Sequence, residues 1–226
     1  MIKAIIFDID NTLLDFMKMK STSIYAAVSG MIKAGMKIDK NKSIKEIYDI
    51  YDTKGYEHQE VFNEFIVNKE GAINYKFLAA GIVEYKKAKE KSLSLYDDVI
   101  PTLDKLLEMN LKLGVVSDAP SREAWIRLYM LNLHNKFKHV VTFDDTGYHK
   151  PAKEPFLRIS NKLNLNLSEC IMVGDWPDRD IKGAKQVGMK AAFAKYGSTE
   201  KVIDSGADHD LESISDLIDI VKEYNI

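Results

Sequence analysis

The sequence has little of several features that mark particular classes of protein. It holds a single cysteine, Cys170, so no internal disulfide can form and we expect a reducing compartment. We find no run of about 18 apolar residues, and the opening residues MIKAIIFDID lack the long apolar segment of a signal peptide. Lysine and arginine number 32 against 34 acidic residues, which leaves no basic excess for binding nucleic acid. We therefore expect a cytoplasmic protein with no membrane or nucleic-acid partner.

What the chain does have is apolar residues, which make up 46% of its 226 positions and suffice for a sizeable core. Short apolar runs predict buried strands at Ala4–Phe7, Leu111–Val116, Val140–Phe143, Ile171–Val173 and Ala191–Phe193. Helical patterns alternate with these runs, at Ile100–Met109, Ser121–Leu133, Glu154–Leu163 and Asp178–Val187. The alternation predicts an α/β fold in which helices cover both faces of a parallel sheet.

A long segment after the first predicted strand has a different pattern. Residues 15–91 look helical throughout. Aromatic residues recur there at helical spacing, and we expect them to form a core of their own; they include Tyr48, Tyr51, Phe62 and Phe65. We therefore predict two domains, a core of residues 1–14 with 95–226 and an all-helical insertion over residues 15–94.

Two aspartates, Asp8 and Asp10, follow the first predicted strand at once, in the sequence FDIDNTL. Ligands of parallel α/β sheets bind beyond the carboxyl ends of the strands. Alternate residues of an extended chain point the same way, so both carboxylates can face one crevice. Paired carboxylates repel each other unless a cation or a proton lies between them. A solvated strand end or a helix cap is the simpler alternative for this pair taken alone.

Polar residues follow three later predicted strands in the same way. Ser117 and Asp118 come after the second strand, Lys150 lies in GYHKP after the third, and Asp175 and Asp180 lie in GDWPDRD after the fourth. Each group has a structural alternative, namely turn chemistry, a solvated lysine or helix capping. The carboxyl ends of parallel strands share one edge of the sheet, so the four groups together predict a single site.

This order of motifs resembles the haloacid dehalogenase superfamily of aspartate-nucleophile hydrolases. FDIDNTL matches D-x-D-x-T-L, Ser117 ends an apolar strand, Lys150 precedes a proline, and GDWPDRD matches G-D-x4-D. The resemblance implies a Rossmann-like, doubly wound core with a helical cap domain inserted after the first strand.

The resemblance also implies roles for individual residues. Asp8 resembles the nucleophile that accepts the phosphoryl group, and Asp10 resembles the general acid that protonates the leaving oxygen and later activates water. Lys150 would balance charge around Asp8 and the phosphate. Mg²⁺ would be held by the carboxylates of Asp8 and Asp175 and the backbone carbonyl of Asp10, which agrees with the preference of this ion for oxygen ligands.

The remaining site residues follow from the same resemblance. The phosphate would be bound by Thr12, Ser117, Asp118 and Lys150, and Asp180 would orient either the metal shell or Lys150. The sequence departs from the family pattern at Asp118, where many relatives carry asparagine or another neutral residue. It also departs at Trp176, where a small polar residue is common. Both departures concern the choice of substrate.

The resulting prediction is a magnesium-dependent phosphatase that hydrolyses a small phosphorylated metabolite through an aspartyl-phosphate. One alternative is a 2-haloacid dehalogenase of the same superfamily, which needs neither metal nor leaving-group acid and is disfavoured by Asp10. A second alternative is a non-enzymatic phosphoacceptor module, which is disfavoured because such receivers are shorter and lack a large insertion. The sequence makes no prediction of the oligomeric state.

Overall fold

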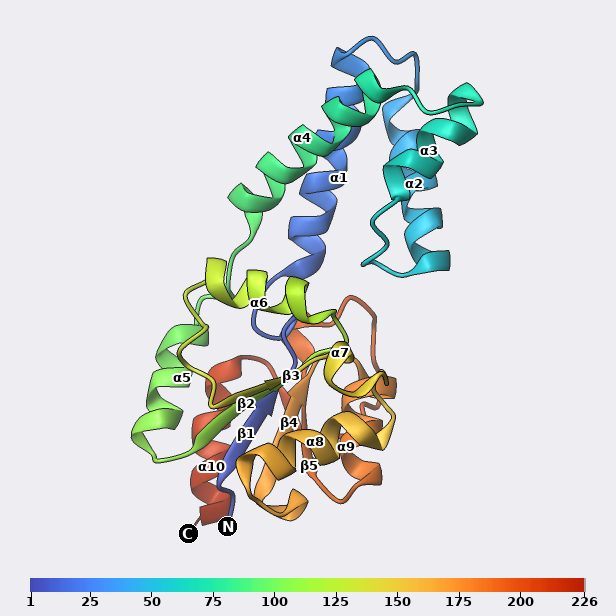
Figure 1. Ribbon diagram of the computed structural model, residues 1–226. Coiled ribbons are helices and arrows are strands. Elements are labelled where there is room, and N and C mark those ends of the chain that lie inside the picture. Colours follow the sequence, from blue (N-terminus) through green and yellow to red (C-terminus); the bar gives the residue numbers. More distant parts are fainter. Residues whose placement is uncertain (226) are drawn as a thin grey trace. The chain divides into compact units, whose positions relative to one another are not determined.

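The computed structural model describes residues 1–225. The chain divides into two compact units, Met1–Asp15 with Ser94–Ile226, and Phe16–Leu93 (Figure 1). We call them the core unit and the helical unit. The domain boundaries predicted from sequence, 1–14 with 95–226 and 15–94, differ from these by one residue at each junction.

The core unit is built on a sheet of six parallel strands in the order β3-β2-β1-β4-β5-β6. The strands are β1 Ala4–Phe7, β2 Lys112–Val116, β3 His139–Val141, β4 Cys170–Gly174, β5 Lys190–Ala194 and β6 His209–Leu211. This strand order confirms the predicted Rossmann-like α/β core. The strand β6 was not predicted, because its three residues include the polar His209 and Asp210 and form no apolar run.

The core unit also contains helices that lie between its strands or after the last of them. They are α5 Val99–Glu108, α6 Ser121–Met130, α7 Phe143–Thr146, α8 Lys153–Leu163, α9 Lys182–Gln186 and α10 Leu217–Asn225. Short 3-10 helices span Leu167–Glu169, Lys195–Gly197 and Ile214–Asp216. The predicted helix Asp178–Val187 begins instead as a π-helical turn, Pro177–Ile181, which continues into α9.

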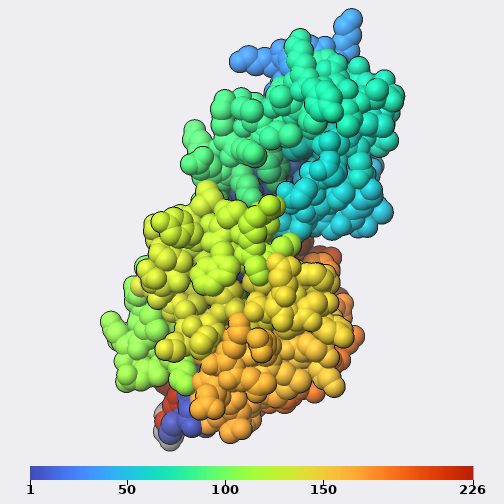
Figure 2. Space-filling view, in the orientation of Figure 1, coloured from blue at the N-terminus to red at the C-terminus, as the bar shows by residue number. Residues whose placement is uncertain are grey.

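Helices pack on both faces of the sheet, as the alternation of side chains along β1 requires. Ala4 and Ile6 point to a cluster that includes Phe156 and Ile159 of α8. Ile5 and Phe7 are also fully buried and, by the same alternation, face the opposite side of the sheet. The yellow and orange residues of α7 and α8 make up much of the face of the core unit seen in Figure 2. Cys170, at the start of β4, is buried in this core and burial raises the pKa of its thiol to about 11.

The helical unit consists of α1 Phe16–Lys33, α2 Lys40–Lys54, α3 Val61–Glu70 and α4 Tyr75–Ser92. Its core includes three of the predicted aromatics, Tyr51, Phe62 and Phe65, while Tyr48 is partly buried against it. Lys20 is also buried, with its ammonium 3.9 Å from the centre of the Tyr51 ring. Within residues 1–225, none of the helices combines the length and the apolar character needed to span a membrane.

Candidate active site

The first site residue, Asp8, directly follows β1. Its backbone N–H donates to the carbonyl of Val173 at 2.9 Å, so the extended backbone continues one residue beyond the strand. The chain then turns: Asn11 has a φ of 55°, and the N–H of Leu13 donates to the carbonyl of Ile9 at 2.9 Å. Left-handed backbone is tolerated by asparagine better than by most residues, which suits Asn11 to this place. The turn leaves Asp8 nearly buried and the side chain of Asp10 23% exposed.

The strand order places Asp8 at the position where ligands bind in folds of this kind. The chain proceeds from β1 to β2 and β3 on one side, and then to β4 on the other, so β1 and β4 flank the topological switch point. Asp8 follows β1 and Asp175 follows β4. Each of these two residues and Asp180 offers a carboxylate oxygen, and the three oxygens lie within 4.8 Å of one another.

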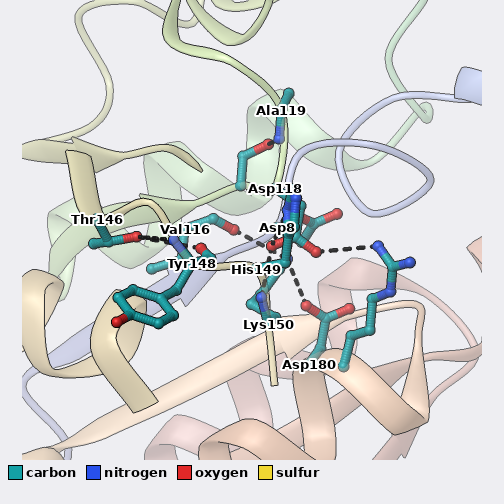
Figure 3. Close-up of polar contacts among 11 residues, drawn as sticks. Asp8, Val116, Asp118, Ala119, Thr146, Tyr148, His149, Lys150 and Asp180 are labelled. Carbon is teal, nitrogen blue, oxygen red and sulfur yellow. Dashed lines mark hydrogen bonds and ion pairs between the residues drawn. The ribbon is translucent and has the colours of Figure 1, made fainter. Parts of the chain in front are cut away.

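Lys150 brings a buried positive charge into contact with this cluster. It precedes α8, and its ammonium lies 2.5 Å from Asp8 Oδ1 and 2.6 Å from Asp180 Oδ1. The same nitrogen donates to the carbonyl of Val116, the last residue of β2, at 3.2 Å. Figure 3 shows Asp8 and Asp180 approaching Lys150 from two different elements. Three strand ends are therefore tied together through one side chain.

The site carries more negative charge than Lys150 can balance. Burial raises the pKa of Asp175 to about 8, and the charges of Asp180 and Asp8 add to this effect. Burial likewise raises the pKa of Asp180 to about 7, against the opposing charge of Lys150. Burial raises the pKa of Asp8 as well, again with Lys150 opposing it. For Lys150, burial alone would lower the pKa, but Asp180, Asp8 and Asp118 together raise it well above its ordinary value. The cluster thus favours a further positive charge.

Asp180 reaches Lys150 because Gly174, which lies against it, has no side chain. A Cβ built on Gly174 would lie 2.2 Å from Asp180 Cγ. The π-helical turn places the second oxygen of Asp180 3.1 Å from the backbone N–H of Trp176, which donates to it. Gly174, the turn and Asp180 therefore form one unit, which explains the spacing of the GDWPDRD motif.

Ser117 and Asp118 follow β2. Ser117 is buried, and its hydroxyl accepts a hydrogen bond from the N–H of Ala119 at 3.2 Å. The carboxylate of Asp118 accepts one bond from the backbone N–H of Lys150 at 2.8 Å and another from Arg179 at 3.2 Å. Asp118 therefore connects the loops after β2, β3 and β4, and the role of its carboxylate seen here is to bind protein donors.

A family profile described as haloacid dehalogenase-like hydrolase matches residues 5–194. The chain belongs to the haloacid dehalogenase-like hydrolase family. It is 34% identical to a glyceraldehyde 3-phosphate phosphatase of Methanocaldococcus jannaschii over 98% of each chain. It is 26% identical to a pyrophosphatase of Oceanobacillus iheyensis, again over 98% of each chain. Among solved structures, a HAD phosphatase of Thermococcus onnurineus matches with a TM-score of 0.72 and 26% identity, covering 97% of this chain and 98% of that one. The chain is thus a phosphatase-type hydrolase of this family.

Two supporting contacts of this haloacid dehalogenase-like hydrolase were not predicted. Thr12 is fully buried, and its carbonyl accepts a hydrogen bond from the hydroxyl of Tyr196 at 2.7 Å. A Cβ built on Gly197 would lie 1.5 Å from the carbonyl oxygen of Asn11. The loop after β5 therefore packs directly on the turn that carries Asp10. A glycine just after a predicted strand was the only signal in the sequence for this close approach.

A third unpredicted contact involves Asp10 itself. Arg127 of α6 lies with its Nη1 3.1 Å from Asp10 Oδ2, and the side chain of Arg127 is 2% exposed. The sequence around Arg127, AWIRLYM, lies inside a helix. The site residues were predicted from their position at the ends of strands, so Arg127 was not among them.

Proposed function

We propose that the chain is a magnesium-dependent phosphatase that hydrolyses a small phosphorylated metabolite through an aspartyl-phosphate on Asp8. The observation that carries this proposal is the ammonium of Lys150 between Asp8 and Asp180, at 2.5 and 2.6 Å, at the switch point of the sheet. A carboxylate held by a buried lysine is positioned and charge-balanced, which is what phosphoryl transfer requires of a protein.

The proposed reaction has two steps. In the first, an oxygen of Asp8 attacks the phosphorus and forms the acyl phosphate, while Asp10 gives its proton to the departing alkoxide oxygen. In the second, Asp10 takes a proton from water, the water oxygen attacks the phosphorus, and the bond to Asp8 breaks to release inorganic phosphate. A carboxylate nucleophile in this way divides one difficult displacement into two easier ones. Lys150 stays protonated throughout and offsets the negative charge around Asp8.

The donor set fits a hard divalent cation. Asp8 and Asp175 offer carboxylate oxygens, and the raised pKa of Asp175 follows from burial and from the charges of Asp180 and Asp8. Asp180 is already paired with Lys150 and with the N–H of Trp176, so it suits an orienting role. We propose that Mg²⁺ is held by the carboxylates of Asp8 and Asp175 and the backbone carbonyl of Asp10. When bound, Mg²⁺ supplies positive charge to the phosphate oxygens and to Asp8.

The phosphate oxygens are proposed to bind to Lys150, the hydroxyl of Ser117 and nearby backbone N–H groups, with Thr12 and Asp118 close by. The fully buried position of Thr12 and the engaged carboxylate of Asp118 favour indirect roles for both, in which they fix the loops that present these donors. We propose that this site accepts a phosphate group because fixed hydrogen-bond donors of the protein replace the water molecules that solvate the phosphate oxygens.

For the substrate we propose a phosphate monoester of a small hydroxylated metabolite, of the size of a triose phosphate. Support comes from the full-length similarity to a glyceraldehyde 3-phosphate phosphatase at 34% identity. Pyrophosphate is the competing substrate class, from the similarity at 26% identity to a pyrophosphatase. The two differ in the leaving group, because a sugar alkoxide needs a proton from Asp10 and a phosphate leaving group needs one far less.

The test is a phosphate-release assay with Mg²⁺ on glyceraldehyde 3-phosphate, pyrophosphate and p-nitrophenyl phosphate, using wild type, Asp8→Asn and Asp10→Asn. We expect the highest kcat/KM on the triose phosphate, no turnover by Asp8→Asn, and loss of Mg²⁺-dependent activity with a chelator. A matched control is Asp144→Asn, which changes an aspartate of α7 that holds the N–H of Ser121. Phosphate release unaffected by Asp8→Asn would refute the mechanism, and halide release from a 2-haloacid without metal would favour the dehalogenase alternative.

A further inference from the structure

The ion pair between Arg127 and Asp10 takes part in neither step of the proposed reaction. We infer that Arg127 is a positioning residue, which holds the Asp10 carboxylate in place for proton transfer to the leaving group. This inference rests on the proposed function, in which Asp10 is the general acid. Arg127 Nη1 lies 3.1 Å from Asp10 Oδ2, and both residues belong to the core unit.

The helix that carries Arg127 buries charged side chains beside the apolar Ala124 and Leu128. Two charged residues of α6, Glu123 and Arg127, are buried, with Arg127 among the largest fully buried side chains of the chain. Trp125 and Tyr129 of the same helix are 45% and 70% exposed. A helix packed only for stability turns its apolar side to the core. The inward position of a guanidinium therefore calls for a local reason, and Asp10 is a charged group that it meets.

Burying an arginine is unfavourable unless its charge is matched. The guanidinium stays protonated in proteins, so it cannot avoid the penalty by losing a proton. The free-energy cost of removing this charge from water is offset only where an opposite charge lies close. Here Asp10 supplies that charge when it is ionised, which is the form that it takes on giving its proton to the leaving group and from which it accepts a proton from water. One of its oxygens faces Arg127, and its side chain is 23% exposed. One oxygen of Asp10 is thereby fixed by the protein.

Asp10 needs such a restraint because of its place in the chain. It immediately precedes Asn11, where the backbone turns through a φ of 55°, and it lies beyond the last paired residue of β1. The backbone alone thus leaves the rotation of the Asp10 side chain undetermined. Lys150 fixes Asp8 by a contact of 2.5 Å, and the pair with Arg127 fixes Asp10 in the corresponding way. Because proton transfer depends steeply on geometry, a misplaced acid loses its effect even when it is present.

The substitution Arg127→Met tests this role because it removes the charge and the fork of donors while keeping much of the apolar stem. The partly exposed Asp10 can then be solvated, so the variant is expected to fold. We would measure kcat/KM on phenyl phosphate and on p-nitrophenyl phosphate, two esters of similar shape. Nitrophenolate leaves without a proton, whereas phenolate gains from one. The ratio of the two kcat/KM values therefore reports on the acid and not on the general integrity of the site.

We expect Arg127→Met to lower kcat/KM on phenyl phosphate by about 10- to 100-fold and on p-nitrophenyl phosphate by less than about 3-fold. In an Asp10→Asn background the same substitution should change neither value further, because the two residues act as one unit. Arg127→Lys keeps the charge, so it should lower kcat/KM on phenyl phosphate less than Arg127→Met does. Arg122→Met is the matched control, since Arg122 lies on the same helix with its side chain 73% exposed, and it should leave both values unchanged.

Two results separate this inference from the proposed function. If Asp8→Asn abolishes turnover but Arg127→Met lowers both kcat/KM values equally, or adds its full effect to that of Asp10→Asn, Arg127 is a structural residue only and the inference is wrong. If Asp8→Asn retains turnover, the proposed function fails and the inference fails with it. Should Arg127→Met not fold, Arg127→Lys gives the same readout, which is kcat/KM on p-nitrophenyl phosphate divided by kcat/KM on phenyl phosphate. A rise in this ratio above the wild-type value supports the role, and an unchanged ratio refutes it.

Discussion

The substitution Gly174→Ala should disable the site by displacing Asp180 and the turn that carries it. The new Cβ would lie 2.2 Å from Asp180 Cγ and 2.3 Å from Asp180 Oδ2, whereas ordinary contact begins near 3.4 Å. Asp180 must therefore retreat by about 1.2 Å (3.4 Å less 2.2 Å). The retreat would lengthen its 2.6 Å contact with Lys150 and weaken its hydrogen bond from the N–H of Trp176.

These distances set how much stability Gly174→Ala should remove. Lengthening an ion pair of 2.6 Å by about 1.2 Å costs about 2 kcal/mol at an effective dielectric constant of about 20. Overpacking in a filled interior costs about 1–3 kcal/mol. Because relaxation of the surroundings recovers part of each, we expect the free energy of unfolding to fall by about 2–4 kcal/mol. For a chain of this size the melting temperature then falls by about 5–15 °C. Displaced Lys150 and Asp180 should lower kcat by about 100-fold.

The assay combines thermal unfolding with phosphate release, and Gly114→Ala of β2 is the matched control. A Cβ at Gly114 would meet the side chains of Ile159, at 3.1 Å, and Leu163, at 3.4 Å, and the ends of both can give way. We expect Gly114→Ala to lose some stability and to keep its activity. Adding Gly174→Ala to Asp180→Gly should cost little further activity, since the three closest atoms, Cβ, Cγ and Oδ2 of Asp180, are then absent. A Gly174→Ala enzyme with unchanged kcat and melting temperature would refute the argument that Gly174 makes room for Asp180.

Three further predictions concern other parts of the chain. Gly197→Ala should lower both stability and activity, by about 3 kcal/mol for unfolding, because its Cβ would lie 1.5 Å from the carbonyl oxygen of Asn11; normal melting would contradict this. At Asp208, burial opposes the charged form, but hydrogen bonds from Lys185 and from a backbone N–H outweigh it and hold the pKa below its ordinary value. Its stabilisation is therefore present above about pH 4 and is lost as the pH falls further, so urea unfolding of wild type and Asp208→Asn should differ at pH 7 and converge at acidic pH. Lys20→Met should lower the free energy of unfolding by about 1–3 kcal/mol through loss of its cation–π contact and its 2.7 Å backbone hydrogen bond, and an unchanged urea midpoint would count against it.

The sequence was most informative where function depends on the ends of buried strands. Apolar runs mark parallel strands, and parallel strands place their carboxyl ends at one edge of the sheet. That rule alone predicts that Asp8, Lys150 and Asp175 lie together, and the structure brings them together with Asp180. Helix periodicity in the same way separates the helical unit from the sheet, to within one residue at each junction.

The sequence was less informative about short or irregular elements. The edge strand β6 has three residues and little apolar character, so no pattern of apolar residues predicts it. The segment that begins at Pro177 has the composition of a helix start, yet it forms a π-helical turn, because Asp180 is drawn to Lys150 and to the N–H of Trp176. Contacts of this kind are set by partners that are remote in sequence.

By itself, then, the sequence determined the α/β core, the helical insertion and the set of strand-end residues that form the candidate site, since local patterns and parallel topology suffice for these. Only the tertiary structure decided which groups hold that site in place. Arg127 meets Asp10, and Tyr196 reaches Thr12 across 184 positions of the chain. The direction in which a helix turns its charged side, and the space available beside a glycine, are fixed by packing between distant segments, and no local pattern contains that information.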